Sequence, residues 1–174
     1  ARGAVWFMNC TGILNGTTNY ILSHLQNGER FEDVIMNARE RGLAEKPKSK
    51  NYTWKKDADL NGKDIYYKLI VLSRLIWNIR PHVIKKDAHL VKHGIGLYNI
   101  RRCDIRYATE KLGQVIKFIG VIKQLRSGDN DYDLFFTPAL LSANHGFSNV
   151  NAETNVLLIS SDFTGTTISM GPGA

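Results

Sequence analysis

An acidic and a basic side chain lie four residues apart at the start of an apolar-periodic stretch. Asp64 and Lys68 are therefore expected on one face of a helix, at the edge of the apolar stripe that contains Ile65, Leu69 and Leu72. In a partly desolvated cleft, such a pair can hold a zwitterionic substrate, and the lysine can transfer a proton. A solvated surface ion pair, which contributes little to stability, is the alternative interpretation.

A further carboxylate could join this pair, because Glu45 follows an expected second helix. Glu45 can bring another carboxylate to the same place, and a solvated loop position is the alternative for it. The five histidines and two cysteines show no spacing typical of metal ligands or of a nucleophile with its base, so we expect no metal site.

A strand that ends in a glycine- and threonine-rich turn, directly before a helix, is the most informative element. Residues 12–22 read Gly-Ile-Leu-Asn-Gly-Thr-Thr-Asn-Tyr-Ile-Leu. The first turn of a helix has backbone N–H groups without helical partners, at the positive end of the helix dipole. Gly16 allows a ligand to approach the backbone, and Thr17 and Thr18 offer hydroxyl groups. A capped helix without a ligand is the alternative.

The order of the remaining elements predicts an α+β domain. After one strand at residues 4–14, helices are expected at residues 16–27, 31–41, 59–78 and 104–112. The last strands are expected as two hairpins, at residues 115–125 with 133–137 and at residues 155–160 with 166–170. This order is typical of a two-layer sandwich with helices packed on one face of a mixed β-sheet.

Length and composition fit one intracellular domain. The chain has 174 residues, and its apolar fraction of 43% is enough for a packed core. No apolar run reaches the ~18 residues that a membrane span needs, and no secretory signal pattern is present. We therefore expect a cytoplasmic protein without membrane contact.

The net charge of +7 raises the question of nucleic-acid binding. Lysines are interleaved with aromatic residues within residues 46–56, a pattern that can pair with phosphates and stack on bases. No recognised nucleic-acid motif or wider basic stripe accompanies this segment. A solvated loop is the preferred interpretation, and nucleic acid is not expected as a partner.

Four ordered stretches resemble one known family. Residues 12–22 are similar to the Gly-Ile-Leu-Asn-Gly-Thr-Thr-Asn-Tyr-Ile-Leu signature of the homoserine dehydrogenases. Residues 38–45 resemble that family's helix ending in Gly-Tyr-Ala-Glu, and residues 59–69 resemble its Asp-x-x-Gly-x-Asp-x-x-x-Lys-Leu motif. Residues 171–174 match its Gly-Pro-Gly-Ala turn.

The resemblance implies that the protein interconverts L-aspartate 4-semialdehyde and L-homoserine with NAD or NADP, a step in threonine and methionine biosynthesis. It implies that Lys68 donates and accepts the proton at the substrate oxygen. The family's sheet also serves in dimer contact, so a homodimer is expected. The remaining implied roles are substrate binding by Glu45, Asp59, Asp64, Gly16 and Thr17, and cofactor binding by Gly171 and Gly173.

The resemblance also sets expectations about domain organisation. Residues 1–174 are interpreted as one substrate-binding and catalytic domain. The family's Rossmann cofactor domain is absent from this chain, so the chain alone should have little activity. A longer, lysine-rich segment between Glu45 and Asp59 replaces the family's compact acidic motif. A non-catalytic dimerisation or binding module that retains the fold is therefore the alternative function.

Overall fold

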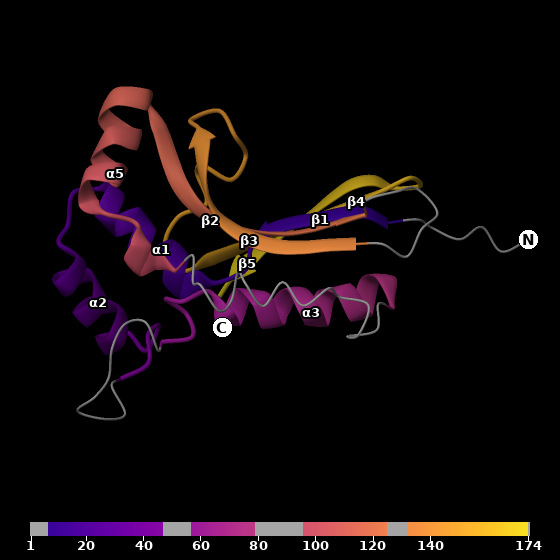
Figure 1. The fold of residues 1–174 in the computed structure, drawn as a ribbon, viewed down its shortest axis with the longest axis horizontal. Coiled ribbons are helices and arrows are strands. Elements are labelled where there is room, and N and C mark those ends of the chain that lie inside the picture. The colour runs from indigo at the N-terminus through magenta and orange to yellow at the C-terminus, as the bar shows by residue number, and fades with distance from the viewer. Residues whose placement is uncertain (1–6, 47–56, 79–95, 125–131, 174) are drawn as a thin grey trace, which may run out of the picture.

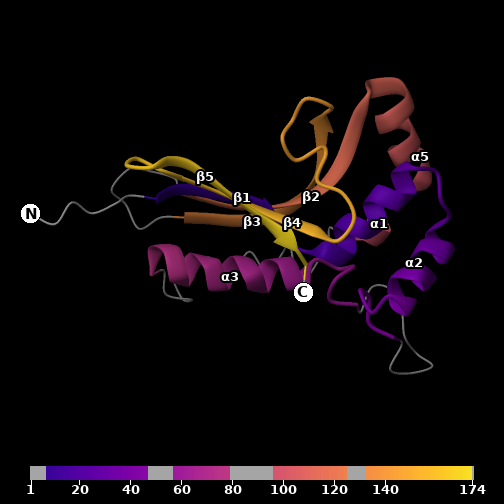
Figure 2. The ribbon, with the colours of Figure 1, turned by 180° about the vertical axis from the view of Figure 1, so that it is seen from behind.

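The computed structural model describes residues 7–46, 57–78, 96–124 and 132–173 (Figures 1 and 2). Its centre is a five-stranded sheet with the strand order β3-β2-β1-β4-β5. The strands are β1 (Phe7–Ile13), β2 (Gln114–Gln124), β3 (Tyr132–Ser142), β4 (Thr154–Ser161) and β5 (Gly165–Pro172). The lysine-rich segment lies outside the described residues, apart from Lys46.

All four strand pairings are antiparallel. The expected hairpins are present, as β2 with β3 and β4 with β5. The α+β class is confirmed, whereas the expectation of a mixed sheet is wrong. The physical reason is visible in Figure 1, because the helical segment between β1 and β2 leaves the sheet and returns to it at the same end. A strand that returns at the same end must run antiparallel to the strand before it.

The helices occupy two positions around the sheet (Figures 1 and 2). α3 (Lys63–Trp77) lies along one face, while α1 (Gly16–Gln26), α2 (Phe31–Glu40) and α5 (Arg102–Arg106) gather at the end where β1 finishes. A 3₁₀ turn, η2 (Leu97–Asn99), precedes α5, and the π-helical η3 (Tyr107–Lys111) follows it. None of the helices in the described part of the chain has the length and apolar character that a membrane crossing requires.

Residues in the left-handed backbone conformation lie at both ends of α3. Gly62 has φ 82° and Asn78 has φ 53°, so neither residue can continue a right-handed helix. The helix expected from residue 59 therefore begins only at Lys63. Glycine is also required at position 62 for space, since a Cβ there would overlap the buried ring of Phe136. This contact fixes the start of α3, where Asp64 lies, against the sheet.

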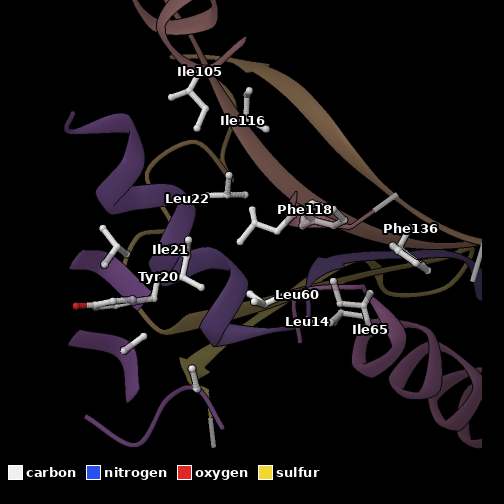
Figure 3. Close-up of a cluster of buried hydrophobic side chains, with 14 of the residues drawn as sticks. Leu14, Tyr20, Ile21, Leu22, Leu60, Ile65, Ile105, Ile116, Phe118 and Phe136 are labelled. Atoms are coloured by element: carbon white, nitrogen blue, oxygen red, sulfur yellow. The ribbon is translucent and has the colours of Figure 1, made fainter. Parts of the chain in front are cut away.

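Two clusters of buried apolar side chains lie on opposite faces of the sheet. The larger one fills the space between the sheet and the helices, and it joins Ile21 and Leu22 of α1 to Ile65 of α3 and Phe118 of β2 (Figure 3). The smaller one consists of Ile13, Ile119, Phe147, Val150 and Val156. Alternating strand residues supply the two clusters, as the pleat of a β-strand requires.

Candidate active site

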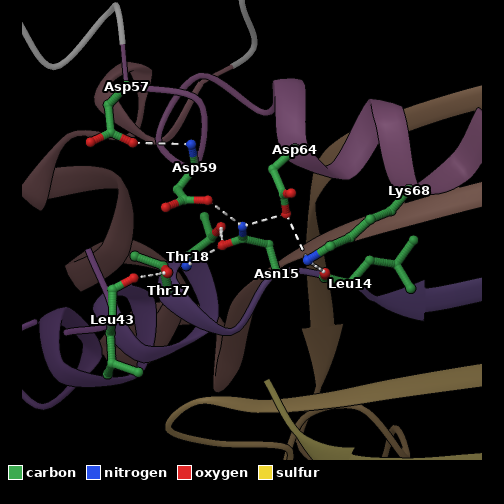
Figure 4. A network of polar contacts seen from close by, with 9 residues as sticks. All are labelled: Leu14, Asn15, Thr17, Thr18, Leu43, Asp57, Asp59, Asp64 and Lys68. Atoms are coloured by element: carbon green, nitrogen blue, oxygen red, sulfur yellow. Dashed lines mark hydrogen bonds and ion pairs between the residues drawn. The ribbon is translucent and has the colours of Figure 1, made fainter. Parts of the chain in front are cut away.

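The side chain of Asn15 links the strand-to-helix turn to the acidic stretch before α3. Its Nδ2 donates hydrogen bonds of 2.8 Å to Asp59 Oδ1 and of 2.8 Å to Asp64 Oδ2 (Figure 4). Its Oδ1 accepts a hydrogen bond of 2.7 Å from Thr18 N and another from the Thr18 hydroxyl, which caps α1. Because both hydrogens and the oxygen of the amide are used, the orientation of Asn15 is fixed. We call Asn15, Thr18, Asp59, Asp64 and Lys68 the Asn15 network.

Lys68 completes this network from α3. Its Nζ lies 2.8 Å from Asp64 Oδ2 and donates a hydrogen bond of 2.9 Å to the carbonyl of Leu14. An ammonium group has three hydrogens, so among the described residues these two contacts leave one N–H for a ligand. The side chain of Lys68 is 43% exposed, which keeps its amine accessible. The i,i+4 pair is thus a surface ion pair that is anchored to the end of β1.

Asp59 is a half-buried carboxylate that contacts Asn15. Burial raises the pKa of Asp59, and the negative charges of Asp57 and Asp64 raise it further, while the hydrogen bond from Asn15 and the charge of Lys68 act in the opposite direction. Three carboxylates and one ammonium group therefore lie in the same stretch, and Asp64 is in direct contact with that ammonium. This local excess of negative charge favours a bound cation, such as the ammonium group of an amino acid.

Asp57 orders the backbone that carries Asp59. Its Oδ1 accepts hydrogen bonds from Asp59 N at 3.0 Å and from Leu60 N at 3.3 Å. Leu60 in turn accepts a hydrogen bond of 2.7 Å from Leu97 N through its carbonyl. Segments far apart in the sequence thus hold the acidic stretch in place before α3 begins.

Gly16 and Gly173 lie against the same carbonyl group. Gly173 N donates a hydrogen bond of 2.7 Å to Glu153 O. A Cβ at Gly16 would lie 2.7 Å from that oxygen, and a Cβ at Gly173 would lie 2.8 Å from it. We call Gly16, the Glu153 carbonyl and Gly173 the glycine cradle. A Cβ at Gly171, by contrast, would meet open space among the described residues.

Thr17 and Glu45 lie at the other side of the α1 N-terminus. The Thr17 hydroxyl donates a hydrogen bond of 2.5 Å to the carbonyl of Leu43, which ties α1 to the segment after α2. Glu45 is exposed, and its carbonyl accepts a hydrogen bond of 3.2 Å from Arg39 Nε, on α2. The structure therefore brings Asp59, Asp64, Lys68, Gly16 and Thr17 to one turn and leaves Glu45 at its periphery.

A pocket of about 390 Å³ opens beside the Lys68 side chain. Its walls are mostly apolar. Asn155 is a polar side chain among them, and its Oδ1 is buried without a hydrogen-bond partner within the described residues. A larger cavity of about 520 Å³ lies at the turn between α1 and α2, away from the Asn15 network. We place the site at the smaller pocket because it adjoins the network. Its lining residues are Leu14, Tyr67, Lys68, Val71, Leu72, Asn155 and Leu157.

Sequence reasoning gave no role to Asn15 or Asn155. The signal for Asn15 was available, because an asparagine directly before the first turn of a helix is a frequent cap. No comparable local signal exists for Asn155, which reaches the pocket only through the pairing of β4 with β1. No group of three or more histidine, cysteine, aspartate and glutamate side chains suited to a metal ion occurs within the described ranges.

Comparison with known proteins identifies a family for this chain. A family model described as homoserine dehydrogenase matches residues 6–174. The homoserine dehydrogenase of Pseudomonas aeruginosa is 30% identical over 164 residues, which cover 94% of this chain and 34% of that protein. That of Synechocystis is 32% identical over 165 residues, which cover 94% of this chain and 35% of that protein. The crystal structure of a homoserine dehydrogenase from Thiobacillus denitrificans superposes with a TM-score of 0.74 at 30% identity, over 97% of this chain and 35% of that chain.

The chain spans about a third of the length of the curated relatives that it matches. Within that third, the match includes nearly the whole chain, from β1 to β5. The chain therefore belongs to the homoserine dehydrogenase family.

Proposed function

We propose that this chain is the substrate-binding and catalytic part of an NAD- or NADP-dependent homoserine dehydrogenase. The reaction is the interconversion of L-aspartate 4-semialdehyde and L-homoserine. One observation supports it above all others: an accessible lysine amine is held between Asp64 and the Leu14 carbonyl at the end of β1. Because the chain spans about a third of its relatives, this activity is proposed for a longer polypeptide that contains it.

The Asn15 network suits an amino-acid substrate. The carboxylates of Asp59 and Asp64 face the same turn, and both can attract the ammonium group of the substrate. In a productive complex, the third N–H of Lys68 would lie at hydrogen-bond distance from the carbonyl oxygen of the substrate, whose carbon is separated from the ammonium-bearing carbon by one methylene group. In this proposal, the apolar pocket beside Lys68 receives the carbon chain of the substrate.

Lys68 transfers the proton in this proposal. In the reducing direction, the semialdehyde carbonyl becomes an alkoxide, and Lys68 donates a proton to that oxygen. In the oxidising direction, the deprotonated amine takes the hydroxyl proton of homoserine. Asp64 and the Leu14 carbonyl hold the amine in place during both steps.

A nicotinamide cofactor fits the backbone at the end of β5. The cofactor, when bound, supplies or accepts the hydride. Gly171 presents no side chain, and the space around it is open among the described residues, so a planar ring can approach it. A relative from Pseudomonas canavaninivorans, 27% identical, bears the name NAD(+)-dependent homoserine dehydrogenase. We propose NAD or NADP for this chain, with most of the nucleotide held by other parts of the polypeptide.

The test is homoserine-dependent reduction of NAD and NADP by the complete polypeptide. Replacing Lys68 with Ala should lower kcat by about 10²–10⁴-fold, the range for loss of a general acid–base group. Lys63→Ala is the matched control, since Lys63 is an exposed lysine on the same helix. Activity that survives Lys68→Ala would refute the proton-transfer role. A complete polypeptide without activity would favour the alternative, a dimerisation or binding module.

We also propose a homodimer that forms through the sheet face opposite α3. Ile168 and Met170 of β5 are each 61% exposed, and they pair with Leu158 and Val156. Val156 belongs to the smaller apolar cluster, and Leu158 packs against it. Exposed apolar side chains grouped on one face often mark a protein–protein contact. Ile168→Glu should halve the mass measured by light scattering. Phe163→Glu, at the exposed β4–β5 turn, should not change the mass.

A further inference from the structure

A second lysine has the opposite environment to that of Lys68. Lys117 lies on β2 with 0% of its surface exposed, on the sheet face opposite α3. Its ammonium donates hydrogen bonds to Val150 O at 2.6 Å, to Asn19 Oδ1 at 3.1 Å and to Asn151 Oδ1 at 3.1 Å. All three N–H groups therefore have an acceptor, and none of these acceptors carries a charge.

Burying an ammonium group without an opposing charge is unfavourable for the stability of the folded state. Burial of the ammonium without an opposing charge lowers the pKa of Lys117 to about 8. An apolar side chain of similar length at this position would avoid that desolvation. We therefore look for the role of Lys117 in the residues that its hydrogen bonds hold in position.

The partners of Lys117 belong to one segment. Asn19, on α1, has its Nδ2 at hydrogen-bond distance from three carbonyls, so its two N–H groups are shared among Val150 at 3.0 Å, Ala152 at 3.0 Å and Thr154 at 3.1 Å. Asn19 Oδ1 is held by Lys117, which fixes the direction in which the amide donates. Ala152 adopts φ 54°, a left-handed conformation that an alanine keeps only when surrounding contacts impose it. We call Lys117, Asn19 and residues 150–154 the lysine clamp.

The lysine clamp ends at the glycine cradle. Glu153 lies between Ala152 and Thr154, whose carbonyls are both bound by Asn19. The Glu153 carbonyl accepts the hydrogen bond from Gly173 N and lies against Gly16. The position of the β5 end relative to the α1 N-terminus is thus set by a carbonyl that the clamp orients.

We propose that Lys117 is a positioning residue that acts through Asn19 and residues 150–154 to hold Gly173 against Gly16, and so shapes the cofactor side of the site. This inference rests on the proposed dehydrogenase function. It assigns Lys117 no contact with substrate or cofactor. Its loss should alter cofactor binding more than proton transfer, because the Asn15 network does not include any clamp residue.

Two readouts test the proposal in the complete polypeptide. Lys117→Met keeps the length of the side chain and removes the charge and the hydrogen bonds. Hydrogen exchange at the Gly173 amide should become at least about tenfold faster, because its acceptor is no longer held, whereas exchange at Cys10 and Ile122 in the central pair β1–β2 should not change. The KM for the nicotinamide cofactor should rise about tenfold, with kcat changed less than about threefold.

Lys123→Met is the matched control, because Lys123 lies on the same strand but is exposed. It should leave both readouts at the wild-type value. If Lys117→Met does not fold, Asn151→Ala replaces it, since Asn151 is exposed and supplies one acceptor of the clamp. That variant should give a smaller change in the same direction, about threefold in each readout.

The outcomes separate this inference from the proposed function. Unchanged Gly173 exchange in a folded Lys117→Met or Asn151→Ala variant overturns the positioning role, whatever the activity. Faster exchange with an unchanged cofactor KM overturns it as well. If the wild-type polypeptide shows no homoserine-dependent reduction of NAD or NADP, the dehydrogenase function fails, and with it the functional part of the inference. The exchange rates then still decide whether the clamp holds the cradle.

Discussion

Two lysines close to the same strand-to-helix turn have opposite surroundings. Lys68 is 43% exposed, contacts a carboxylate and keeps one N–H available. Lys117 is fully buried, contacts only neutral oxygens and has no N–H left for a ligand. The proton transfer proposed for Lys68 requires an accessible amine with a compensating charge, whereas the positioning role proposed for Lys117 requires neither.

The largest effect is expected where α3 is fixed to the sheet. Gly62→Ala places a Cβ on a left-handed residue and against the buried ring of Phe136. We expect a loss of about 4 kcal/mol in the free energy of unfolding, from strain and overpacking together. Gly28→Ala is the control, because Gly28 also has a positive φ but open space around it, and it should lose only about 1 kcal/mol. Urea unfolding measures both values, and equal losses would contradict the steric explanation.

The next largest effect is a dependence of stability on pH that arises from Lys117. Burial lowers the pKa of Lys117 from its ordinary value of 10.5, which the unfolded chain retains, to about 8 in the folded chain. Between these pH values, the unfolded state binds more protons than the folded state, so stability rises with pH. Relative to Lys117→Met, the wild type should gain up to about 3 kcal/mol between about pH 8 and pH 10.5. If the difference in unfolding free energy between the wild type and Lys117→Met stays constant over this range, folding does not lower the pKa of Lys117.

A smaller effect concerns the charge that compensates Lys68. Asp64→Asn keeps an acceptor for Asn15 but removes the carboxylate beside the amine. We expect kcat/KM for homoserine to fall about 30-fold, equivalent to ~2 kcal/mol of lost transition-state stabilisation. Asp33→Asn, on the exposed first turn of α2, is the control and should be neutral. An unchanged kcat/KM in Asp64→Asn would show that Lys68 does not depend on this charge.

The smallest effect is expected at Asp59, and it has two parts of opposite sign. Burial raises the pKa of Asp59, which means that its charged form destabilises the folded state. Asp59→Asn should therefore raise the free energy of unfolding. It should also raise the KM for homoserine, because one attraction for the ammonium is lost. Thermal unfolding and steady-state kinetics test the two parts. A variant that is less stable than the wild type would contradict the first part.

The sequence predicted the elements that local pattern determines. The strand-to-helix turn, the helix that carries Asp64 and Lys68 and both hairpins are present, and the convergence of Asp59, Asp64 and Lys68 on the turn is observed. The start of α3 was missed because local pattern does not reveal that Gly62 adopts φ 82° and lies against the ring of Phe136, where a Cβ has no room. That constraint comes from a residue 74 positions away in the sequence.

The lysine clamp could not be predicted from local sequence pattern either, because it also depends on contacts between distant segments. Lys117 lies in a run of apolar strand residues, and alternation alone can leave a lysine on a solvated face. Its burial depends on residues 147–150, which follow β3 and cover that part of the sheet. Contacts of this kind depend on how distant segments pack, so only the folded structure reveals them.

The most direct test of the account is chemical rescue of Lys68→Ala in the complete polypeptide. The vacated position lies between the Asp64 carboxylate and the Leu14 carbonyl, which can hold a small alkylammonium ion. We predict that added methylamine restores homoserine oxidation in a saturable manner, and that Lys63→Ala gains nothing from it. A Lys68→Ala enzyme whose residual rate is insensitive to amines, or whose rate equals that of the wild type, would contradict the claim that this amine carries the proton.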